Sequence, residues 1–181
     1  MELLTHSHPA ALPPLNVRWR SFELRPAGSP PLPPDYLAKI EAGRSRLAAV
    51  ARESYGLTLN PGPFGIRSRP ALVAEKFALS AGCGERFHGR LMHAYWAQAL
   101  DISERAVLGG VADACGLDQA ALLAALEDPL FDQQVQEDLD AARRYGLNSV
   151  PALVFAERYL VSGAQPVDVL RNVVEQIVRS V

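Results

Sequence analysis

Cysteine is scarce in this chain, whose 181 residues contain only Cys83 and Cys115. These two residues are too far apart for a Cys-x-x-Cys motif, and no spacing typical of a zinc site occurs. Thiol–disulfide exchange uses a thiolate whose pKa is lowered, and a Cys-x-x-Cys at a helix N-terminus is the usual source. The sequence therefore predicts no metal site and no dithiol centre of that kind.

The two cysteines differ in their sequence surroundings. Cys115 ends an apolar helical run, which indicates a small buried core residue. Cys83 lies in the turn 81–84 between two helices, where we expect more exposure. It is therefore a candidate reactive thiol, with an incidental loop cysteine as the alternative. We expect no Cys83–Cys115 disulfide in a reducing cytosol.

The chain also lacks a strong charge of one sign and any long apolar run. Eighteen Lys and Arg oppose twenty Asp and Glu, a net charge of −2, which gives no electrostatic reason to bind nucleic acid or an anionic membrane. No apolar run approaches the length of a spanning helix, and residues 1–14 lack the features of a signal peptide. We expect a cytoplasmic protein, provided that no signal precedes Met1.

What is present fits one folded core with an insertion, because apolar residues make up 49% and charged residues 21% of a chain of this length. Helical patterns dominate the middle of the sequence. A proline-rich link over 26–34, which cannot be helical, follows an extended stretch over 15–24. The segments expected to be helical are 35–55, 70–81, 84–100, 103–115, 118–127, 128–145 and 166–179.

Residues 145–166, YGLNSVPALVFAERYLVSGAQP, carry the clearest pattern. A charged helix stops at Gly146, the residue type that suits a left-handed C-cap. The apolar runs 152–155 and 159–161 predict two short strands joined by a tight polar turn. Pro151 cannot donate to a sheet ladder, so it must begin its strand or lie at an edge. X-Pro bonds are also the ones for which cis geometry costs little.

This order of elements resembles the C-terminal half of a thioredoxin fold. The segments that carry a more specific resemblance are Trp19–Pro26, Asn60–Gly65, Ser68–Leu72, Ala94–Trp96 and Gly163–Pro166. In sequence order they are similar to the DsbA-like family, in particular its FrnE-like branch, which is related to 2-hydroxychromene-2-carboxylate isomerases and kappa-class glutathione transferases. No single tetrapeptide is diagnostic, but the series extends from about Val17 to the C-terminus.

The resemblance implies an α/β thioredoxin-like fold, incomplete at its N-terminus, with an inserted helical domain. The sheet-bearing unit would comprise residues 15–34 and 128–181, and the helical insertion residues 35–127. It also implies a first strand that ends in Cys-x-x-Cys, between 15–24 and 150–155 in the sheet. Residues 1–14 contain neither such a strand nor a cysteine. We favour truncation of the sequence over a natural remnant that has lost redox chemistry.

Absence of that strand has an energetic consequence. Each buried backbone group left without a partner costs about 1–3 kcal/mol, against a typical net stability of about 5–15 kcal/mol. We therefore expect one of three outcomes: poor stability, direct pairing into a three-stranded sheet, or association, such as a homodimer, that covers the gap.

The implied function is a DsbA/FrnE-like thiol–disulfide oxidoreductase that is inactive as given, acting on protein or peptide thiols and disulfides or on a small thiol substrate. One alternative is the glutathione-dependent isomerase or transferase branch. Of the functions considered, only this one would use a cofactor, which is glutathione. The other is a non-catalytic thioredoxin-like module that binds peptides.

Five residues are implied to line the substrate site. Val150 and Pro151 would form the cis-proline loop, whose backbone pairs with an extended peptide or with glutathione; a trans proline is the alternative. Phe22 leaves the sheet at the same end and is expected to pack there. Asn60 and Ser68 belong to the loop of the insertion that faces the active site in the family. The preference of Asn and Ser for turns near proline explains the presence of both residues equally well.

Overall fold

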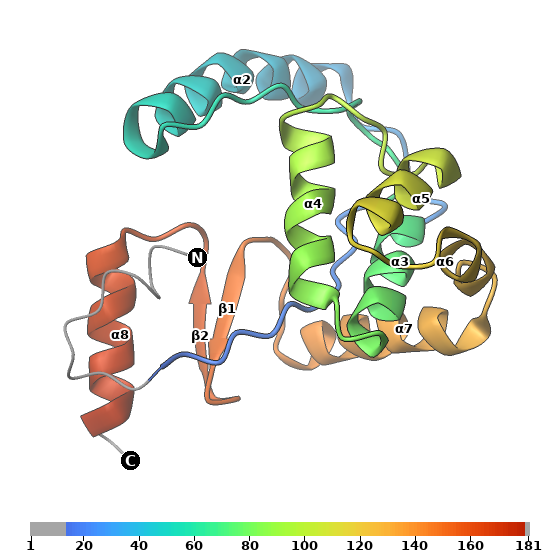
Figure 1. The fold of residues 1–181 in the computed structure, drawn as a ribbon. Helices are drawn as coiled ribbons and strands as arrows, with labels where there is room; N and C mark the ends of the chain where they lie inside the picture. Colours follow the sequence, from blue (N-terminus) through green and yellow to red (C-terminus); the bar gives the residue numbers. More distant parts are fainter. Residues whose placement is uncertain (1–13, 180–181) are drawn as a thin grey trace. The chain divides into compact units, whose positions relative to one another are not determined.

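The protein is described over residues 14–179 from a computed structural model. Seven helices and two strands lie in this range (Figure 1). They are α2 (Pro34–Tyr55), α3 (Arg69–Ser80), α4 (Gly84–Trp96), α5 (Arg105–Ala114), α6 (Gln119–Ala125), α7 (Pro129–Arg144), β1 (Ala152–Phe155), β2 (Tyr159–Ser162) and α8 (Val167–Arg179).

The chain folds as two compact units. Of the described residues, the first comprises 14–24 and 138–179, and the second Arg25–Glu137. Relative to the boundaries expected from sequence, the second unit also takes in the proline-rich link and the first half of α7. We call them the hairpin unit and the helical unit.

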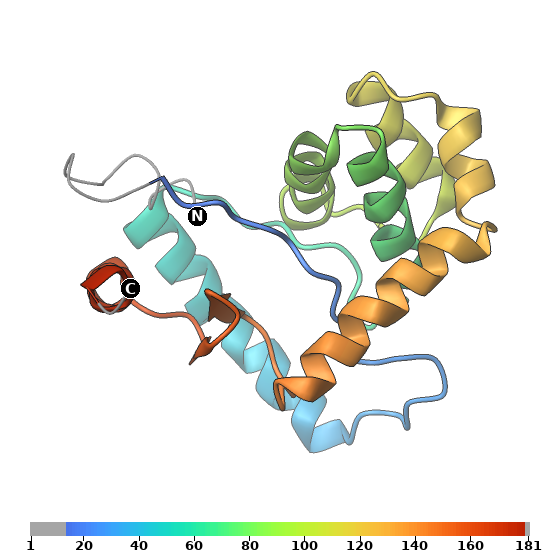
Figure 2. The same ribbon diagram turned by 90° about the horizontal axis from the view of Figure 1, so that it is seen from below.

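Helices α3, α4, α5 and α6 pack together in the helical unit, as both Figure 1 and Figure 2 show. Phe87 and Leu91, one turn apart on α4, point into the centre, where Leu108 of α5 and Leu122 of α6 meet them. All four side chains are buried. Alanines on α3 let the neighbouring helices approach closely, so the unit has a close-packed centre.

The start of α7 is fastened to α3 within the same unit. Phe131 packs edge to face on Phe77, with ring centroids 5.7 Å apart. Arg69 donates to Asp132 over 2.6 Å, and this hydrogen bond lowers the pKa of the Asp132 carboxyl. The acidic first turn of α7 therefore has both a helix terminus and an arginine to stabilise its charge.

In the hairpin unit, β1 and β2 pair antiparallel, with Leu153 opposite Val161 and Phe155 opposite Tyr159. Ala156 and Glu157 between them have positive φ, and Arg158 N–H donates to Phe155 C=O over 3.0 Å. This is the turn geometry that matches the twist of paired strands. The predicted hairpin is therefore confirmed.

The predicted strand over 15–24 is wrong. Residues 14–23 form no strand, and the sheet of the described residues has two strands, which also excludes the expected three-stranded sheet there. This segment bonds to a helix instead: the backbone N–H of Ser21 donates to Asp138 Oδ2 over 2.7 Å, and the guanidinium of Arg20 donates to Asp138 Oδ1 over 2.9 Å. A side chain of α7 thus satisfies a buried donor that a strand would have used in a ladder.

Candidate functional site

The loop between α7 and β1 holds two of the expected site residues. Gly146, with φ of 67°, ends the helix, and the chain then reaches Val150, whose exposed fraction is 46%. The Val150–Pro151 peptide bond is cis. The carbonyl of Pro151 accepts a hydrogen bond of 2.9 Å from Gly163 N–H. This bond fixes the start of β1 directly after the exposed residue Val150.

The Pro151–Gly163 bond also fixes which way the backbone of β1 points. Hydrogen-bonded and non-hydrogen-bonded pairs alternate along an antiparallel ladder. With Pro151 bonded to Gly163 and the register known, Leu153 directs its N–H and C=O toward β2. Ala152 and Val154 therefore direct theirs to the opposite edge. Within residues 14–179 no strand pairs with that edge.

Phe22 lies in the same unit and is half-buried. Its position is set by Ser21, which is held by Asp138. Asp138 itself is 3% exposed. This anchor was not predicted from the sequence. An acidic residue in helical register with the apolar Val135 and Ala142 was the available signal, because a carboxylate on a buried face needs a partner.

Asn60 and Ser68 belong to the helical unit, and the structure gives both of them local roles. Asn60 N–H donates to Trp96 C=O over 2.7 Å, and Asn60 C=O accepts from Ala99 N–H over 3.0 Å. Ser68 C=O accepts from Leu72 N–H at the start of α3. These are main-chain bonds that shape a loop and begin a helix. Their geometry fits the turn interpretation.

The loop that Asn60 begins runs close against the end of α4. Gly62 N–H donates to Tyr95 C=O over 2.7 Å. A Cβ on Gly62 would lie 2.4 Å from the carbonyl oxygen of Leu100 and 2.8 Å from the Tyr95 ring. No side chain fits there unless the backbone shifts, so this glycine permits a close approach of two chain segments.

We expect Gly62→Ala to lower the free energy of unfolding of the helical unit by about 1–2 kcal/mol, because the added methyl meets main-chain atoms. Gly89→Ala is the matched control, since Gly89 lies in α4 with nothing within 4 Å of the added Cβ. There alanine should stabilise by about 0.5–1 kcal/mol. Urea denaturation followed by the helical circular dichroism signal measures both. An unchanged free energy of unfolding in Gly62→Ala would contradict the close approach of the two chain segments.

The expected exposure of Cys83 is wrong, because its exposed fraction is 7%. Cys83 N–H donates to Ala78 C=O over 2.8 Å, and its own carbonyl accepts from Phe87 N–H, so it leads into α4 with its side chain in the core. The expected burial of Cys115 is confirmed, at 1% exposure. Both cysteines are free thiols in the structure.

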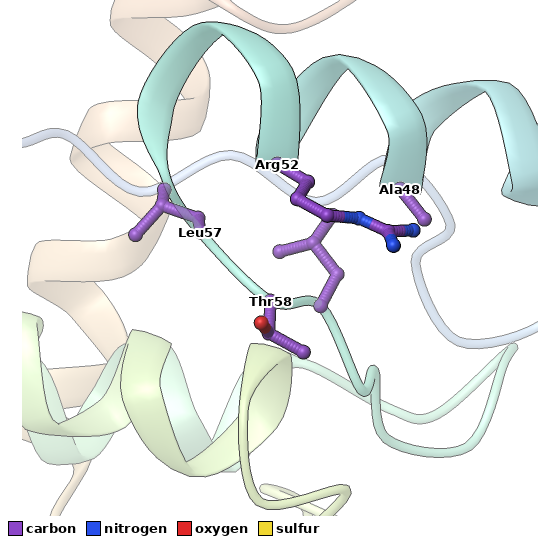
Figure 3. Close-up of a pocket in the computed structure, with 5 residues that line it drawn as sticks. Ala48, Arg52, Leu57 and Thr58 are labelled. Carbon is purple, nitrogen blue, oxygen red and sulfur yellow. The ribbon is translucent and has the colours of Figure 1, made fainter.

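Two hollows lie in the helical unit. One, of about 180 Å³, lies beside the end of α2, where Arg52 and Ala48 face Leu57 and Thr58 (Figure 3). The other, of about 440 Å³, lies between α4 and α5. Neither contains Asn60, Ser68 or Cys83.

Residues 14–179 contain no cluster of three or more His, Cys, Asp or Glu side chains able to hold a metal ion. The helices described for this range are also too short or too polar for one of them to cross a bilayer.

Comparison with known proteins agrees with the fold. The profile of the DsbA-like thioredoxin domain matches residues 2–175. The uncharacterised protein YwbO of Bacillus subtilis is 26% identical over 167 residues, which is 88% of this chain and 81% of YwbO. A probable DsbA oxidoreductase from Streptomyces coelicolor superposes with a TM-score of 0.75 at 26% identity, over 87% of this chain and 73% of that one.

A 2-hydroxychromene-2-carboxylate isomerase also shares the fold, with a TM-score of 0.71 and 17% identity over 83% of this chain and 73% of the isomerase. The fold is therefore the thioredoxin-like fold expected from the sequence, with a helical segment in its middle. Because the family profile spans nearly the whole sequence, the chain belongs to the family of DsbA-like thioredoxin domains.

Proposed function

We propose that this chain is a scaffold of the DsbA/FrnE-like thiol–disulfide oxidoreductases that binds protein or peptide thiols and disulfides without exchanging them through a Cys-x-x-Cys. Family membership supports the substrate class, since a structural relative of 26% identity is a probable DsbA oxidoreductase. Binding would occur at the loop that ends in Val150 and Pro151 and along the adjoining edge of β1.

One observation carries the proposal: β1 begins beside the exposed residues Val150 and Pro151 and directs the N–H and C=O groups of Ala152 and Val154 to an edge with no strand in the described residues. An extended peptide added to such an edge gains main-chain hydrogen bonds whatever its sequence. Half-buried side chains on β1 supply apolar contact beside them. A substrate cysteine would thus be held at the loop by its flanking backbone.

The non-catalytic part rests on the two thiols that the chain has. Exchange with a protein disulfide needs a thiolate that the protein substrate can reach. Cys83 and Cys115 are 7% and 1% exposed in the helical unit, which keeps a substrate as large as insulin from either sulfur. Neither thiol lies in the unit that carries Val150 and Pro151. We therefore expect this chain not to accelerate the reduction of insulin by dithiothreitol.

Peptide binding at the β1 edge is tested with a fluorescent, unstructured peptide that contains one cysteine, followed by anisotropy. Val154→Pro removes a donor from the proposed edge and is expected to weaken binding tenfold or more. Leu160→Pro is the matched control: Leu160 is opposite Val154 in the register, so its N–H points away from β1 and its loss should leave affinity unchanged.

Circular dichroism first establishes that both proline variants keep the wild-type secondary structure. Equal loss of affinity in the two variants, or none in Val154→Pro, would show that the peptide does not use this edge. Insulin reduction faster than with dithiothreitol alone would contradict the non-catalytic half of the proposal.

A further inference from the structure

The helical unit brings together two cysteines that are 32 positions apart in sequence. Cys83 immediately precedes α4 and Cys115 immediately follows α5. The Cys83 thiol donates to the carbonyl oxygen of Cys115, with 3.7 Å between sulfur and oxygen. The two thiols also lie within hydrogen-bonding range of each other, a contact that helps to raise the pKa of Cys115.

Arg86 lies over this pair. Its guanidinium donates to the same carbonyl oxygen of Cys115. A hydrogen bond with the Cys83 thiol, and the charge of that thiol when ionised, raise the pKa of the arginine. The arginine side chain is exposed, so an anionic reagent in solvent meets a positive charge at the entrance to two thiols.

The two thiols differ in how readily each would react with a reagent from solvent. Burial raises the pKa of Cys115, and a hydrogen bond with the Cys83 thiol adds to that effect. Cys115 is also the less exposed, at 1% against 7% for Cys83. We therefore expect Cys83 to react first with a reagent from solvent, and Cys115 to react second, with Cys83.

We propose that Cys83 and Cys115 are a redox couple that a low-molecular-weight, anionic disulfide oxidises to an intramolecular disulfide. In the first step the Cys83 thiolate attacks one sulfur of the reagent, the S–S bond breaks, and the leaving thiolate takes up the proton that Cys83 lost. In the second step the Cys115 thiolate attacks Cys83 Sγ, and the second reagent thiolate leaves and takes up the Cys115 proton. Two electrons pass from the cysteine pair to the reagent, which is reduced to two thiols.

The bond would tie the start of α4 to the end of α5, two helices that already pack together. Closing that loop restricts the unfolded chain and so stabilises the folded helical unit. The cysteine pair and the β1 edge lie in different units, so oxidation of the pair and peptide binding at the edge are measured separately, and failure of one does not imply failure of the other.

The test exposes the full chain to oxidised glutathione, whose carboxylates suit Arg86. The sample is quenched with acid, unfolded, and treated with N-ethylmaleimide before intact-mass analysis. The expected product lacks two hydrogens and takes up no maleimide, yields a Cys83–Cys115 linked peptide, and reverts with dithiothreitol. Its unfolding midpoint should rise by about 5 °C.

Two variants test the order of the steps. Cys115→Ser should stop at a stable mixed disulfide between glutathione and Cys83, whereas Cys83→Ser should not react on the same timescale. Arg86→Ala should slow the oxidation about fivefold. Arg90→Ala, which removes a charge one turn further along α4, is the matched control and should leave the rate unchanged.

Two maleimide adducts on wild type after prolonged exposure would overturn the proposal, as would a mixed disulfide at Cys83 that never resolves. Oxidation that proceeds only in urea would also overturn it, because the couple would then form from the unfolded chain.

Discussion

Replacing Phe87 by alanine is expected to destabilise the helical unit by about 3–5 kcal/mol. Phe87 has no exposed surface, and it lies where α4 meets the buried side chains of α3, α5 and α6. Removing the ring loses its transfer free energy and leaves a cavity that close-packed neighbours fill only in part. A loss of this size is a large fraction of the stability of a typical domain.

The measurement uses urea denaturation in a Trp19→Phe background, so that Trp96, in α4, reports on the helical unit alone. Phe64→Ala is the matched control in the same unit, because Phe64 is 46% exposed and should cost about 0.5 kcal/mol or less. Similar losses for the two variants would show that the core does not centre on Phe87.

The second large effect is expected for Asp138→Ala in the hairpin unit, at about 2–3 kcal/mol. The variant leaves the buried N–H of Ser21 without its acceptor, and that loss dominates. The ion pair with Arg20 adds little, since the arginine side chain is 65% exposed and its charge is screened by solvent.

Trp19, two residues before Ser21, reports on this unit by fluorescence in a Trp96→Phe background. Asp140→Ala is the control on the same helix: Asp140 bonds Arg143 on the surface, so its loss should cost about 0.5 kcal/mol or less. If Asp138→Ala cost no more than Asp140→Ala, residues 14–24 would not depend on this anchor.

The hairpin and the helices were predictable because their signals are local. Gly146 ends α7, the apolar runs set β1 and β2, and Pro151 can only begin a strand. Asp118 also caps α6 as its residue type suggests, accepting from Ala121 N–H over 2.7 Å. Each of these choices is decided within a few residues of the chain.

The misassigned features depend on distant residues. Val17, Trp19 and Phe22 favour a strand by propensity, but a strand also needs a neighbour, and this segment bonds to Asp138 instead. Glycines on both sides of Cys83 indicated an exposed turn, yet packing of α4 buries its side chain. Sequence pattern does not encode which distant partner a segment meets.

The candidate site was predictable in part. The sequence identified Val150 and Pro151, and the structure places them at an exposed loop before β1. The direction of the Ala152 and Val154 amides follows only from the strand register and the Pro151–Gly163 bond. The closeness of Cys83 to Cys115 likewise required the packing of α4 against α5.

Amide hydrogen exchange at Val154, with and without the cysteine-containing peptide, tests the claim on which the proposed function depends. An N–H directed to an edge without a partner should exchange quickly in the chain alone and at least about tenfold more slowly in the complex. Leu153, bonded toward β2, should be protected in both samples. A Val154 amide already protected without peptide, or unchanged when peptide is bound, would contradict the account.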